Sequence, residues 1–273
     1  MKPKNIVHKA DPNKEWLFIK SLKLAKSNPG KTGLMILFDA MFILSLFGFK
    51  TLGSYLGTIP GQPSTRAWVI IMLIFVLAYY LLILFSYSFF KYCLLDFIKS
   101  LFHKTEFTFR RLGQFYILNI IIGGIFLGIL LMASFILESI KQEYAPYTFI
   151  FLAIPYLLLL YIITNASHSL FYEGASIKQS VKDSFKLAFT GIRLYRETIL
   201  VMILSALLLL LLFFGSGYLL RMATSKNYGN YLIAYAYFKQ IAIIAFDFVL
   251  YWIILINRIS FYELIREDMQ KIH

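Results

Sequence analysis

Four polar side chains stand inside long apolar stretches of the sequence: Asp39, Asn119, Asn165 and Asp247. An ionised carboxylate in hydrocarbon costs about 2.5–3.5 kcal/mol or more, so each aspartate requires an explanation. No Lys or Arg stands in the middle of these stretches to neutralise them. If the four side chains converge, they form a polar intramembrane site for a proton or a cation.

The alternative is that each polar side chain hydrogen-bonds to a neighbouring helix and only fixes the packing. Such a contact contributes about 0.6–2 kcal/mol in a membrane. Because the sequence reveals no partner for either aspartate, we favour this packing interpretation.

The sequence contains none of the common catalytic or metal-binding motifs. It has no H-E-x-x-H, no G-x-S-x-G and no Walker-type phosphate loop. Cys93 is the only cysteine, and the four histidines stand in separate segments. We interpret His168 as an ordinary residue at the membrane interface. We therefore predict that the chain is not an enzyme and that it binds no metal and no cofactor.

The composition is that of a membrane protein. Hydrophobic residues make up 59% of the 273 residues and charged residues 15%, and the mean hydropathy is +0.71. Soluble domains have roughly 45–50% apolar and about 25% charged residues. About 20 apolar residues are needed to cross the hydrocarbon core. Six stretches approach or exceed this length, at about residues 33–50, 67–90, 113–137, 147–171, 198–220 and 234–256.

These stretches predict an all-α, polytopic fold in which six transmembrane helices form one bundle. The whole chain, residues 1–273, is then a single integral membrane domain with a polar tail at about 258–273.

The positive charge is concentrated on one predicted side of the membrane. Of 27 Lys and Arg, 21 fall in the N-terminal segment, in 91–112, in 173–197 and in the C-terminal tail. Positive residues stay in the cytoplasm. We therefore predict a plasma-membrane protein with both termini cytoplasmic. The basic residues adjoin a bilayer and none is spaced for base contacts, so we predict no nucleic-acid partner.

A five-residue sequence occurs twice, which indicates internal repetition. Phe-Ile-Lys-Ser-Leu stands at 18–22 and again at 97–101, and Ser-Phe-Lys-Leu-Ala at 184–188 is similar to Ser-Leu-Lys-Leu-Ala at 21–25. A long apolar run follows each serine after 12 to 14 residues. Repetition at a fixed period is typical of a fold built from like units. We predict three pseudo-repeats, about 13–90, 91–172 and 173–257, each an amphipathic cytoplasmic helix followed by a helical hairpin.

The third repeat begins with the clearest amphipathic pattern. Ile177, Val181, Phe185 and Ala188 follow helical spacing on one stripe, while basic residues lie on another face. One interpretation is a helix lying flat at the lipid headgroups with its apolar side down. The other is a helix that packs this stripe against the ends of the spans, and both stay open. The basic residues predicted to contact headgroups in the three repeats are Lys20, Lys23, Lys99, Lys178, Lys182, Lys186 and Arg193.

Residues 173–187 read Glu-Gly-Ala-Ser-Ile-Lys-Gln-Ser-Val-Lys-Asp-Ser-Phe-Lys-Leu, with serines at 176, 180 and 184. This segment resembles the loop after the fourth span in a six-helix membrane domain found beside glycerophosphodiester phosphodiesterase domains. Stand-alone relatives of that domain occur in archaea and bacteria. Ser180 stands where Ala is commoner in that family. The resemblance implies the six-span fold and a membrane location, but no activity, because the phosphodiesterase domain is absent from these residues.

Taken together, these patterns favour a structural or regulatory membrane module that contacts anionic lipid headgroups through basic amphipathic helices. The alternative is a small transporter or channel with a polar site around Asp39 and Asp247. The expected partners are membrane lipids, and the expected oligomeric state is monomer or homodimer.

Overall fold

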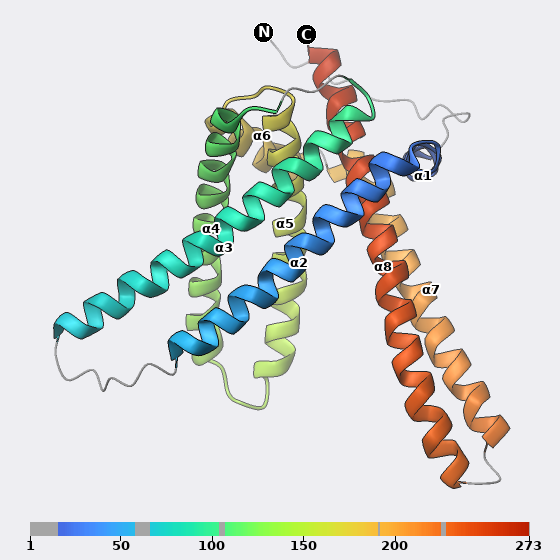
Figure 1. Cartoon of the computed structure of the whole chain (residues 1–273). Coiled ribbons are helices and arrows are strands. Elements are labelled where there is room, and N and C mark those ends of the chain that lie inside the picture. The colour runs from blue at the N-terminus through green and yellow to red at the C-terminus, as the bar shows by residue number, and fades with distance from the viewer. Residues whose placement is uncertain (1–15, 58–65, 104–106, 191, 225–227, 273) are drawn as a thin grey trace. The chain divides into compact units, whose positions relative to one another are not determined.

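The computed structural model describes residues 16–57, 66–103, 107–190, 192–224 and 228–272 (Figure 1). All regular structure in these residues is α-helical. In chain order the helices are α1 (Leu17–Ser27), α2 (Pro29–Gly57), α3 (Arg66–Ser100), α4 (Phe109–Glu138), α5 (Ala145–Tyr172), α6 (Ile177–Thr190), α7 (Ile192–Thr224) and α8 (Tyr228–Ile272).

Six of these helices, all except α1 and α6, are long and apolar enough to cross a membrane. Each lies on one of the six predicted stretches and extends beyond it at one end or both. This confirms the predicted all-α, six-span fold class, and the chain is a multi-pass integral membrane protein. Most of the span surface is exposed and apolar, as contact with lipid requires.

The helix boundaries follow from Gly and Pro. Pro29 opens α2 because proline lacks the backbone N–H that the first turn leaves unused, and Asn28 accepts the first helical bond from the Thr32 amide at 3.0 Å. No Gly or Pro interrupts α3, so the start of the second predicted repeat, at residue 91, lies within that helix, and among the described residues no separate amphipathic helix precedes α4 there. Likewise, α8 contains no Gly or Pro after Gly229 and continues through the segment expected to be a polar tail, as far as Ile272.

The chain forms two compact units. Unit 1 contains the residues up to Ala25 together with Leu194–Leu264, and therefore most of α1, α7 and α8. Unit 2 contains Lys26–Arg193 together with Ile265–His273, and therefore α2 to α6.

Unit 1 is an antiparallel hairpin of α7 and α8 with α1 attached to it. The Phe213 and Phe238 rings stack at 5.6 Å between centroids. The backbone N–H of Phe18 on α1 donates to Glu197 Oε1 on α7 at 3.4 Å. On its other side, α1 reaches α8 through an ion pair between Lys20 and Glu263.

Unit 2 consists of two antiparallel hairpins, α2–α3 and α4–α5, with α6 packed on α4 and α5 (Figure 1). The Ser45 and Ser86 hydroxyls meet at 3.1 Å between α2 and α3. The core of the unit lies at the end where α6 packs, and it is aromatic. Its largest fully buried rings include Tyr92 and Phe115, whose centroids lie 5.6 Å apart.

Candidate functional site

Five polar side chains from three spans gather in unit 2, and we call them the polar cluster: Ser88 and Lys91 on α3, Asn119 on α4, and Asn165 and His168 on α5. Each is more than nine-tenths buried. Polar groups in an apolar interior are costly unless they are hydrogen-bonded, so their partners decide what the cluster can do.

A chain of hydrogen bonds runs through α5, α4 and α3. His168 Nε2 lies 2.6 Å from Asn119 Oδ1. The Asn119 amide N–H donates to Ser88 Oγ at 2.9 Å, and the Ser88 hydroxyl donates to the Leu84 carbonyl at 2.7 Å. Because the amide uses its N–H on Ser88, its oxygen accepts from His168. This arrangement fixes the imidazole as the tautomer protonated at Nε2.

Lys91 is held by a second amide of the cluster. Its Nζ donates to Asn165 Oδ1 at 3.3 Å, and the Asn165 amide N–H donates to the Tyr161 carbonyl at 2.9 Å. Asn165 and His168 are three residues apart and share one face of α5. The structure therefore brings two of the four predicted intramembrane residues, Asn119 and Asn165, into one cluster.

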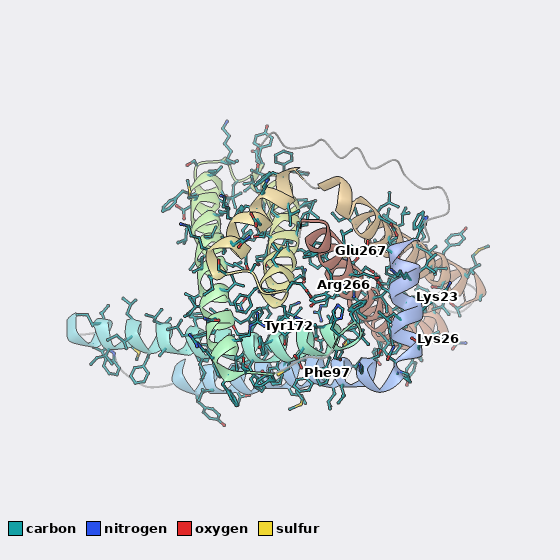
Figure 2. The ribbon with its side chains drawn as sticks, turned by 90° about the horizontal axis from the view of Figure 1, so that it is seen from above. Lys23, Lys26, Phe97, Tyr172, Arg266 and Glu267 are labelled. Atoms are coloured by element: carbon teal, nitrogen blue, oxygen red, sulfur yellow. The ribbon has the colours of Figure 1, made fainter. Side chains whose placement is uncertain are left out.

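The end of α5 is bound to α3 by two further contacts. The Tyr172 hydroxyl donates to Asp96 Oδ1 at 2.6 Å, and Lys99 Nζ donates to the Tyr172 carbonyl at 3.0 Å. Figure 2 views this end of unit 2 from above, with Tyr172 labelled beside α3. Lys99 thus satisfies a terminal carbonyl of α5 and places a cation at the negative end of the helix.

The turn between α5 and α6 has a defined backbone conformation. The amides of Gly174 and Ala175 each donate at 3.1 Å, to the carbonyls of Phe171 and Leu170, a Schellman motif. Gly174 has φ +111°, a conformation that favours glycine. Ser176 Oγ then accepts from the Gln179 amide at 3.3 Å and caps the start of α6.

α6 packs through small residues rather than through its large apolar ones. Ser180, Ser184 and Ala188 are buried, whereas the stripe of Ile177, Val181 and Phe185 is only half-buried. Small side chains allow the backbone of α6 to approach α4 and α5 closely, which favours packing through this face. The opposite face of α6 exposes a row of three lysines: Lys178, Lys182 and Lys186.

α1 shows the same pattern of burial at matching positions. Its buried residues are Leu17, Ser21 and Ala25, again spaced by four. Lys23 is exposed, as is Lys186 at the position that corresponds to it in α6. Lys20, also predicted to contact headgroups, is paired with Glu263.

None of the remaining predicted residues is a member of the polar cluster as defined above. Asp39 is half-buried on α2 of unit 2, and Asp247 is exposed on α8 of unit 1. Arg193 lies in α7, and its side chain is outside the described part. Among the described residues, no group of His, Cys, Asp and Glu is arranged to hold a metal ion.

Sequence reasoning missed Ser88, Lys91 and His168. Lys91 falls in the basic segment 91–112, which the charge distribution places in the cytoplasm, and the sequence favours an interfacial position for His168. The signal that marks them is a pair of polar residues three apart at the end of a long apolar segment: Ser88 and Lys91 on α3, and Asn165 and His168 on α5.

Comparison with known proteins does not place the chain in a family. No family model, no curated protein and no solved structure matches the chain.

Proposed function

We propose that the protein is a structural or regulatory membrane module that contacts anionic lipid headgroups through lysine-bearing helices. The observation that carries this proposal is the orientation of α6. Its small-residue face is buried against α4 and α5, and Lys178, Lys182 and Lys186 are exposed in one row on the other side. Lysines near an anionic leaflet each attract its headgroups by about 1 kcal/mol.

The position of α1 supports the same function. α1 ends at Ser27, and α2, the first span, begins at Pro29, so the helix lies next to a point of membrane entry. Its exposed residues include Lys23, Lys26 and Ile19, and Trp16, which directly precedes the helix, is also exposed. Amphipathic aromatic rings and lysines with long apolar stems suit the headgroup region. We place both helices at the cytoplasmic leaflet, in keeping with the distribution of positive charge.

The test is lipid binding by the detergent-purified full chain, measured by native mass spectrometry. We expect phosphatidylglycerol to bind more tightly than phosphatidylcholine. Changing Lys178, Lys182 and Lys186 together to Gln should weaken phosphatidylglycerol binding by about 1 kcal/mol per charge. Phosphatidylcholine binding should not change, because it depends on no net charge.

A charge-matched control is available at exposed residues that the charge distribution places outside the cell. The triple change Lys50→Gln, Lys141→Gln and Arg221→Gln removes the same charge from these exposed positions. It should leave phosphatidylglycerol binding within error of the parent protein. Equal loss in both triple variants, or no loss in the α6 variant, would refute a specific headgroup role for α6.

A second candidate function is a small transporter or channel with a polar site within the membrane. The observation that favours it is the convergence of Asn119 and Asn165 on buried Lys91 and His168. Ionisable residues within membrane spans often mark ion or proton pathways. The proposed relationship to the phosphodiesterase-associated membrane domain does not separate the two functions, since it implies no activity.

A further inference from the structure

One ring nitrogen of His168 is hydrogen-bonded and the other is not. Nε2 is bonded to Asn119, and among the described residues no donor or acceptor reaches Nδ1. The side chain is completely buried. In the tautomer fixed by Asn119, Nδ1 carries a lone pair, so it is a buried base without a partner.

The surroundings of His168 are aromatic. The Phe115 ring on α4 lies 4.6 Å from the imidazole between centroids, and the Tyr87 ring on α3 lies 6.3 Å away. Lys91 on α3 acts electrostatically on the imidazole. A second proton on His168 would therefore create an imidazolium beside a buried ammonium.

Other charged groups at this end of unit 2 have partners of their own or are exposed at least in part. Asp96 on α3 accepts from Tyr172, and Lys99 on α3 donates to the Tyr172 carbonyl. α6 packs on α4 and α5, but its lysines are exposed, and its Asp183 is half-exposed. Among the described residues, no contact supplies a carboxylate to the imidazole.

We propose that Nδ1 of His168 is a proton-binding site, and that filling it opens the packing between α3, α4 and α5. The bound proton adds an N–H without an acceptor and a positive charge next to Lys91. Both effects destabilise the packing of α3, α4 and α5 that buries the polar cluster. Acidification therefore shifts the protein toward states in which the polar cluster is exposed to water. α6 loosens with it, because α6 is packed on α5 and α4.

The test compares thermal unfolding of the full chain in lipid nanodiscs at about pH 8 and about pH 5, on either side of the ordinary histidine range. The variant His168→Gln keeps an amide N–H near the place of Nε2 and removes the titratable nitrogen. We expect the parent protein to lose several degrees of melting temperature on acidification, and His168→Gln to lose clearly less. His103→Gln, which removes an exposed histidine, should behave like the parent. Equal acid sensitivity in the parent and His168→Gln would overturn the proposal.

A second measurement does not depend on the folding of His168→Gln. In protein labelled with ¹⁵N-histidine, we expect one histidine at about pH 8 whose Nδ1 is unprotonated and whose Nε2–H is protected from exchange with water, because it is buried and bonded to Asn119. The chain has only three other histidines. Gain of a proton at this Nδ1 should coincide with weaker protection of α5 amides from exchange with water, measured relative to the intrinsic exchange rate at each pH. Protonation of Nδ1 without any change in that exchange would overturn the proposal.

Discussion

Lys20 on α1 and Glu263 on α8 form an ion pair across unit 1, with 2.6 Å between Nζ and Oε1. The two ends differ in their surroundings, because the Lys20 side chain is 51% exposed and the Glu263 side chain 2% exposed. Among the described residues, the second carboxylate oxygen of Glu263 has no hydrogen-bond partner. Lys20 is thus a cationic partner of a buried carboxylate, and it joins α1 to the last span.

Removing the cation should therefore cost more than an ordinary surface substitution. We expect Lys20→Gln to lower the free energy of unfolding by about 1–3 kcal/mol, between the values for exposed and buried pairs. Lys26→Gln, an exposed lysine on the same helix, should change it by less than about 0.5 kcal/mol. Reversible unfolding in mixed micelles measures both. A double-mutant cycle with Glu263→Gln should show coupling between the two residues, and additive effects would contradict the pairing.

The α5–α6 turn gives a prediction about backbone conformation. Gly174→Ala places a Cβ on a residue with φ +111°, and we expect it to lower the free energy of unfolding by about 1–3 kcal/mol. Gly128→Ala is the matched control, because that glycine is helical and a Cβ there meets no atom within 4 Å. It should be neutral or stabilising by about 0.5–1 kcal/mol. The same unfolding experiment distinguishes them, and equal effects would show that the turn tolerates a side chain.

The two span aspartates distinguish the proposed module from a transporter. With Asp39→Asn and Asp247→Asn combined, we expect normal expression and unchanged phosphatidylglycerol binding, because neither side chain belongs to the lysine row of α6. Proton movement into proteoliposomes loaded with a pH-sensitive dye is the measurement. We expect no flux above that of empty vesicles from either protein. A flux in the parent that the double variant abolishes would instead support the transporter.

The polar cluster shows where sequence reasoning stops. The residues Asn119 and Asn165 are visible as candidates in the sequence because an amide in an apolar stretch is unusual. His168 and Lys91 are not, because each stands near the end of its stretch and looks like an interfacial residue. Only the packing of α3 on α4 and α4 on α5 shows that both are buried and bonded to these amides.

For α6, too, the sequence determines one part of the structure and tertiary packing determines the other. The four-residue spacing of Lys178, Lys182 and Lys186 fixes them on one face, because a helix turns once in about 3.6 residues. Which face packs against the protein depends on the neighbouring surface, and close approach to α4 and α5 selected Ser180 and Ser184 over the larger apolar residues.

The sequence by itself determined the six spans and the all-helical class, since crossing a membrane depends on the length and hydropathy of each segment taken alone. The tertiary structure alone decided that His168 bonds Asn119, that Lys91 bonds Asn165 and that Lys20 pairs with Glu263. These contacts join helices far apart in the chain, and they depend on how each helix is rotated and how closely its neighbours approach.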